Sequence, residues 1–129
     1  MTVLTIVLIV KIGVTLFAVV LPFLVFSKKK LDLLLQMKAE SPSLYRLYGV
    51  AVLALLVGYG SGIHQIVQDI YPSGIIAMGI TSNAGAALVL FLTGAAKRNK
   101  FLTVFFTLIA VCLIGAALNP EAAMTALSS

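Results

Sequence analysis

Four long apolar stretches dominate the chain and alternate with short polar segments. They cover residues 3–26, 47–67, 72–94 and 101–118. Each is close to the roughly 20 residues that a helix needs to cross the hydrocarbon core of a bilayer. None alternates apolar and polar residues as the strands of a membrane barrel do. The pattern therefore predicts an all-α integral membrane protein, a four-transmembrane-helix bundle that forms a single domain over residues 1–129.

The basic residues lie almost entirely in two of the connections. Residues 27–46 hold five lysines and arginines and residues 95–100 hold three, whereas the remaining connection and the C-terminal tail hold none. Loops rich in Lys and Arg stay on the cytoplasmic side of a membrane. We therefore expect both of these loops to be cytoplasmic and both termini to be non-cytoplasmic, in a multi-pass protein of a bacterial inner (plasma) membrane. Residues 31–39 of the first loop could form a short interfacial helix.

The amino-acid composition and net charge indicate which binding partners to expect. Hydrophobic residues make up 61% of the chain and charged residues only 10%, compared with about 25% charged residues in soluble domains. The net charge of +5 is explained by the two basic loops, so we expect no nucleic-acid partner. The expected partners are the lipid bilayer and other membrane protein subunits or further copies of this chain. Cys112 is the single cysteine, which excludes an internal disulfide.

Lys11 is the only charged residue inside one of the four stretches. By helical spacing it shares one face with three other residues, Thr15, Ala18 and Pro22. We expect this face to meet other helices, with Lys11 in the outer half of the membrane. The lysine could snorkel to the surface or form a structural ion pair with Asp69. It could instead contact a ligand carboxylate or take part in proton transfer.

The second stretch carries a polar stripe near its outer end. Its members fall on roughly one side of a helix and are expected to face inward: Gly58, Ser61, Gly62, His64, Gln65, Gln68 and Asp69. His64 is the only histidine, so one copy of the chain offers at most one axial ligand to a haem or chlorophyll-type pigment. A metal site would need further ligands, for which Asp69 is a weak candidate, and none is predicted.

The third stretch contains the run GITSNAGAA, which places small residues four apart on one face. That face holds Gly79, Ser82, Asn83, Ala86 and Ala87. Small residues let helix backbones approach closely, and an asparagine at this depth bonds across to another helix. We therefore expect a helix interface here, with Gly58 and Gly62 packing similarly in the second stretch. The alternative is that Ser82, Asn83 and Tyr59 line a small polar pocket or part of a permeation path.

Motifs of known chemistry are missing. The sequence has no Gly-rich phosphate loop, GxSxG elbow, HExxH helix or paired carboxylate in a span, so we expect no catalytic residues and no enzyme activity. The first hypothesis is a non-catalytic accessory or assembly subunit that packs against other membrane proteins. The second is a homo-oligomeric channel or transporter for a small solute. The third is a binder of lipid, quinone or pigment, with Lys11, His64 or Tyr59 at the polar end of the site; no other cofactor is predicted.

Overall fold

A computed structural model describes residues 1–126, and the secondary structure of this part of the chain is helical apart from an isolated β-bridge between Thr2 and Ala126. Within it, four helical segments are long and apolar enough to cross a membrane: Val3–Val25, Pro42–Val67, Ser73–Leu92 and Lys100–Leu118. The predicted all-helical class and the four stretches are therefore confirmed. The second segment begins at Pro42 rather than Leu47, because the Ser41 hydroxyl caps the helix and a proline is favoured in the first turn.

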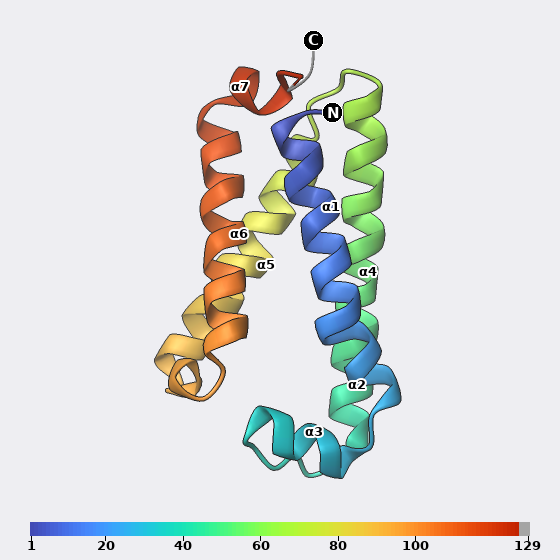
Figure 1. Cartoon of the computed structure of the whole chain (residues 1–129), viewed down its shortest axis with the longest axis vertical. Coiled ribbons are helices and arrows are strands. Elements are labelled where there is room, and N and C mark those ends of the chain that lie inside the picture. Colours follow the sequence, from blue (N-terminus) through green and yellow to red (C-terminus); the bar gives the residue numbers. More distant parts are fainter. Residues whose placement is uncertain (127–129) are drawn as a thin grey trace.

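The four segments form two pairs. The first segment consists of α1 (Val3–Thr15), the π-helical turn η1 (Leu16–Val20) and α2 (Leu21–Val25), and it packs on α4 (Pro42–Val67). The other pair is α5 (Ser73–Leu92) with α6 (Lys100–Leu118), which share the most extensive helix contact. Figure 1 shows the two pairs close together at the end that holds both termini and diverging toward the other end.

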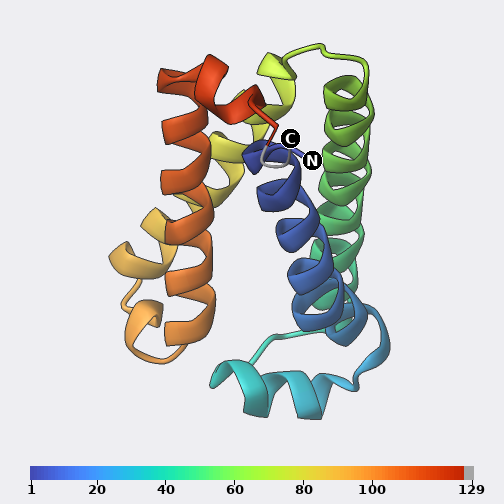
Figure 2. The same cartoon turned by 45° about the horizontal axis from the view of Figure 1, so that its top comes forward.

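The two basic connections lie together at one end of the molecule, which we call the basic end. It contains α3 (Lys28–Leu35), lying across the bundle, and the short η2 (Ala95–Lys97) (Figure 2). The opposite end, which we call the terminal end, holds Met1 and α7 (Pro120–Met124). The short helix expected over residues 31–39 forms earlier, because the Ser27 hydroxyl caps its start and Gln36 ends it with a left-handed φ of 52°.

The π-helical turn η1 changes which residues of the first segment face inward. Lys11 and Thr15 are buried, as the spacing predicts, but Ala18 is exposed and Val19 is buried in its place. A π-helical turn contains an extra residue, so every position after it rotates around the helix. The prediction that Ala18 belongs to the buried face was therefore wrong.

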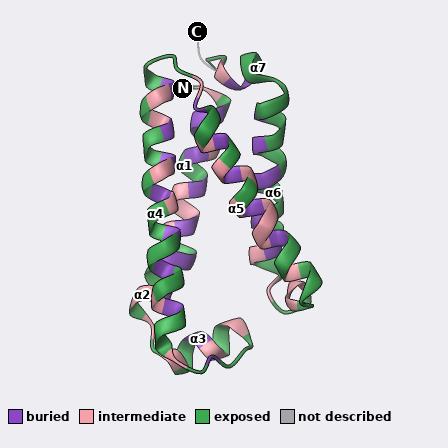
Figure 3. Ribbon diagram, turned by 180° about the vertical axis from the view of Figure 1, so that it is seen from behind, coloured by how far each residue is buried: buried purple, intermediate pink, exposed green. Residues whose placement is uncertain are grey.

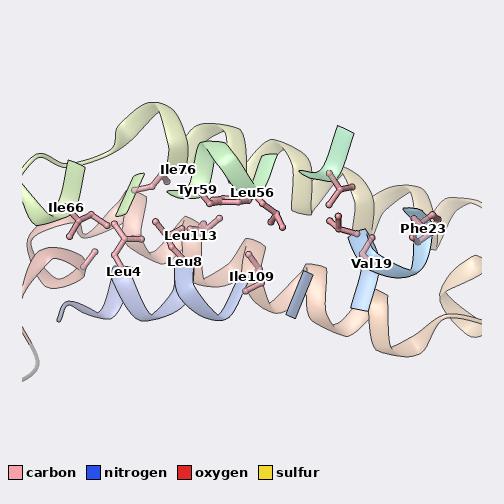
Figure 4. Packing of buried hydrophobic residues seen from close by; sticks show 14 of the residues in the cluster. Leu4, Leu8, Val19, Phe23, Leu56, Tyr59, Ile66, Ile76, Ile109 and Leu113 are labelled. Carbon is pink, nitrogen blue, oxygen red and sulfur yellow. The ribbon is translucent and has the colours of Figure 1, made fainter. Parts of the chain in front are cut away.

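Buried residues follow the inner faces of both pairs (Figure 3). Their hydrophobic cluster is densest toward the terminal end, where Leu8, Tyr59 and Leu113 have no exposed surface (Figure 4). At the same end the Tyr71 hydroxyl donates to the Ala116 carbonyl over 2.9 Å. The terminal end of the bundle is thus well packed.

The Asp32 carboxylate forms an ion pair within α3 and a hydrogen bond to the start of α4. Asp32 Oδ2 lies 2.6 Å from Lys28 Nζ, the only ion pair in the described part of the chain. Asp32 Oδ1 accepts from the Tyr45 hydroxyl and from the Ala39 backbone N–H. The carboxylate therefore holds both the loop and the first turn of α4 in place.

We expect the Asp32 carboxyl to titrate well below its ordinary range. Hydrogen bonds from Lys28 and then from Tyr45 lower its pKa to about 2, whereas an unfolded aspartate has a pKa of about 3.9. Since the folded value is the lower one, the stabilisation is complete above the unfolded pKa and is lost as the pH falls toward 2. Carbon-detected NMR titration of the carboxyl group would measure this. Tyr45→Phe should raise the midpoint, and a wild-type midpoint near 4 would contradict the interpretation.

Candidate functional site

Lys11 is held inside the bundle and does not snorkel, since it is only 5% exposed. Its Nζ donates to Asn83 Oδ1 over 2.7 Å and lies 5.0 and 4.9 Å from the ring centroids of Phe105 and Phe106. The pair with Asp69 that the sequence allowed does not form. Asp69 is exposed in the turn after α4, whereas Lys11 lies roughly 12 Å along the helix from Val3.

Asn83 is the centre of a hydrogen-bond network between α1, α4 and α5. While its Oδ1 accepts from Lys11, its Nδ2 donates to Tyr59 Oη over 3.0 Å and to the Gly79 carbonyl over 2.7 Å. The hydroxyls of Tyr59 and Ser82 lie 3.3 Å apart. The structure thus brings together the three residues that the sequence grouped as a candidate pocket, and it adds Lys11 to them.

A small cavity of about 40 Å³ adjoins this network. Lys11, Asn83 and Thr15 contribute to its wall. The Thr15 hydroxyl oxygen is buried without a hydrogen-bond partner among the described residues. A buried polar group normally finds a partner, and one water molecule needs only about 10–15 Å³ of such space. The cavity therefore has both the room and the unused polar atom to receive an oxygen atom of a guest.

A much larger open pocket lies between α4, α5 and α6 in the basic half of the bundle. Its volume is about 890 Å³, within the range of small-molecule sites, roughly 300–1,000 Å³. The walls are mostly apolar, with charged residues only where the pocket meets the basic end, at Lys38, Glu40 and Arg98. Six residues line both this pocket and the small cavity: Tyr48, Val52, Leu55, Ser82, Ala86 and Phe106. The polar network therefore stands at the inner limit of an apolar pocket.

Comparisons with known proteins assign no family. No family model, no curated protein and no solved structure matches the chain. The geometry around Lys11, Asn83 and the open pocket is thus the basis for inferring function.

Most polar members of the α4 stripe face away from this site, contrary to the sequence prediction, whereas Gly62 is buried and Gly58 is half-buried as expected of an inward face. Ser61, His64 and Asp69 are exposed, Gln65 is half-buried, and His64 Nε2 lies 3.2 Å from the side-chain nitrogen of Gln68. The inward face of α4 is instead formed by residues three or four apart, Val52, Leu56, Tyr59, Gly62 and Ile66. Among residues 1–126, no three His, Cys, Asp or Glu side chains gather in a way that could hold a metal ion.

The small residues do mark places of close packing. A Cβ atom at Gly79 would lie 2.5 Å from Leu113 Cδ1, and one at Gly62 would lie 2.9 Å from Ile75 Cγ2. A Cβ atom at Gly58 would lie 3.1 Å from Met78 Cε. Ala87 is buried, whereas Ala86 is half-buried and lines the open pocket. The helix face within GITSNAGAA therefore packs against neighbouring helices and also lines part of the open pocket.

Proposed function

We propose that the protein binds an apolar small molecule of the membrane in the open pocket between α4, α5 and α6. The observation that carries this proposal is the pocket itself, an apolar space of about 890 Å³ that ends at a buried polar network. Ligand sites combine apolar walls with a few polar groups that orient the guest. Of the functions that the sequence allows, lipid or quinone binding fits this arrangement best.

Packing at the terminal end argues against a permeation path through one copy of the chain. Leu8, Tyr59 and Leu113 fill the space beyond the polar network without exposed surface. The stripe that could have lined a path, including Ser61 and His64, is on the outside. A pocket that is open toward the basic end and closed at the terminal end supports binding better than conduction.

We place the basic end at the cytoplasmic face of a bacterial inner membrane, with both termini on the other side. Eight basic residues lie in the connections of that end or at the adjoining starts of α4 and α6, and such basic segments are retained in the cytoplasm. Large apolar side chains such as Phe17, Val57 and Leu92 are exposed on the outer faces of the helices, where lipid would cover them. In this orientation the pocket opens at the level of the cytoplasmic leaflet.

Filling the pocket at Gly85 tests the proposal. Gly85 lines the pocket, and among the described residues no atom lies within 4 Å of a Cβ atom built there, so Gly85→Leu should place its side chain in the pocket without a clash. The matched control is Gly60→Leu, an exposed position on α4 that is equally free of neighbouring atoms in residues 1–126. Native mass spectrometry of gently extracted protein should show a bound small molecule on the wild type and on Gly60→Leu, reduced roughly tenfold or more on Gly85→Leu. Equal occupancy of all three proteins, or none, would refute the proposal.

A second candidate function is that of an accessory subunit, which the outward stripe of α4 favours. Ser61, His64 and Gln68 are exposed on the face that also holds Gly60. Polar side chains on a spanning helix are costly in lipid but favourable at a helix interface, where small residues allow close approach. The same spectra test this candidate, because Gly60→Leu should release a partner subunit that Gly85→Leu retains. A wild-type protein without any partner mass would contradict it.

A further inference from the structure

We propose that the ligand presents an anionic oxygen group, a carboxylate, to Lys11 at the inner limit of the open pocket. This inference rests on the proposed function and specifies the chemical class of the ligand. The expected molecule is a single-chain amphiphile, such as a fatty acid, whose apolar chain lies along the pocket toward the basic end.

The network around Lys11 is rich in hydrogen-bond donors and lacks a negative charge. A lysine amine carries three donors when protonated, and one of them is used on Asn83 Oδ1. The only ion pair in the described chain is Lys28–Asp32, so no carboxylate neutralises Lys11. The rings of Phe105 and Phe106 supply only a weak cation–π attraction. A buried cation without a counter-charge favours an anion that arrives with the ligand.

A second and independent observation is the unpartnered hydroxyl of Thr15. Thr15 is only 1% exposed, its Oγ1 has no hydrogen-bond partner in residues 1–126, and it lines the small cavity together with Lys11. A carboxylate has two oxygens, so one could accept from Lys11 while the other accepts from Thr15. The cavity of about 40 Å³ exceeds the roughly 10–15 Å³ that one water molecule needs, so it has room for the oxygen atoms of such a head group.

The shape of the large pocket fits the apolar part of such a molecule. Its wall on α4 runs from Leu44 to Leu55, a distance of roughly 16 Å at about 1.5 Å per residue. Because Val52, Leu55 and Phe106 line both spaces, a chain in the pocket would bring its head group to the Lys11 network. The opposite orientation would place the anion at the mouth, near Lys38 and Arg98. The buried and unneutralised position of Lys11 favours the first orientation.

Paired probes of equal chain length test the charge at this site. Wild-type protein in nanodiscs of zwitterionic lipid would be titrated with dodecanoate and with 1-dodecanol, using native mass spectrometry to count bound molecules. We expect Lys11→Met to weaken dodecanoate binding roughly tenfold or more, because charge-assisted hydrogen bonds are about twice as strong as neutral ones. Binding of 1-dodecanol should change less than threefold or so. Thr15→Val, which retains the lysine, should weaken dodecanoate binding by a smaller factor. Gly85→Leu should weaken the binding of both probes.

Three results would overturn this inference. One is equal loss of both probes in Lys11→Met, which would show that the lysine acts on packing and not on charge. Another is a loss of dodecanoate binding in Lys38→Met and Arg98→Met but not in Lys11→Met, which would place the anion at the mouth. The third is a wild-type protein that binds neither probe or prefers 1-dodecanol. The proposed function has a separate test. Wild-type protein extracted from its own membrane should carry a bound small molecule, and Gly85→Leu should lose it.

Discussion

Replacing Asn83 with leucine is expected to lower the free energy of unfolding by about 3 kcal/mol. Asn83 supplies the only hydrogen-bond acceptor that Lys11 uses within the described chain, at 2.7 Å, and also donates to Tyr59. A neutral interhelical hydrogen bond in a membrane is worth only about 0.6–2 kcal/mol. The larger value is expected here because the loss leaves a buried amine without an acceptor.

Reversible unfolding in mixed detergent micelles would measure this effect. The chain has no tryptophan, so helix content followed by circular dichroism is the suitable signal. The matched control is Thr81→Leu on the same helix, because Thr81 is exposed and its hydroxyl bonds only its own helix at Ala77. We expect a change below about 0.5 kcal/mol for the control.

The double variant Lys11→Met with Asn83→Leu distinguishes the contribution of the Lys11–Asn83 hydrogen bond to stability from the effect of changed side-chain packing. Removing both partners leaves no unsatisfied group between them, so most of the lost stability should return. If the two single effects instead add, or if Asn83→Leu unfolds at the same detergent fraction as Thr81→Leu, the Lys11–Asn83 bond does not contribute to stability.

The four spans could be predicted because each depends on a property of a continuous stretch of sequence. A helix with about 20 apolar residues is the main way to satisfy the backbone in lipid. The starting point at Pro42 was missed because Arg46 interrupts the apolar run. In the structure Arg46 lies within α4 and donates from its two terminal guanidinium nitrogens to the carbonyls of Phe23 and Phe26, which closes the end of α2.

The candidate site could be predicted only in part, because its residues come from three helices. Tyr59, Ser82 and Asn83 lie at similar depth in their spans, and depth can be counted along a sequence. The partner of Lys11 depends on how α1 packs beside α5. The sequence favoured the acidic Asp69, whereas the structure uses a neutral amide 72 positions away in the chain.

Two further features have no signature in the periodicity of the chain. The π-helical turn at Leu16–Val20 rotates the face that follows it, and no residue pattern in LFAVV identifies such a turn. The open pocket lies where the two helix pairs diverge, and its lining comes from several helices, so no single stretch of sequence encodes it. The polar stripe of α4 failed as a guide for a related reason. A polar residue on a spanning helix can face another subunit as well as the interior of its own bundle, and residue type alone does not distinguish the two.

Replacing Gly79 with alanine is expected to destabilise the protein by about 2 kcal/mol, through overpacking of the α5–α6 contact. The added Cβ atom would lie 2.5 Å from Leu113 Cδ1 and 3.1 Å from Tyr59 Oη. Both neighbours are fully buried, so a shift of either side chain would disturb the packing around it. The expected shift of α5 would also lengthen the bond from Asn83 to Tyr59, which ties the packing defect to the candidate site.

Gly115→Ala on α6 provides the matched control for this prediction. Gly115 is exposed and, within residues 1–126, has no atom within 4 Å of an added Cβ atom. An alanine there gains the helix preference over glycine, up to about 1 kcal/mol, without a steric cost. The two variants differ only in what surrounds the new methyl group, so their unfolding transitions should move in opposite directions. If both move together, Leu113 has an alternative rotamer with enough room, and the close approach of α5 to α6 does not require glycine.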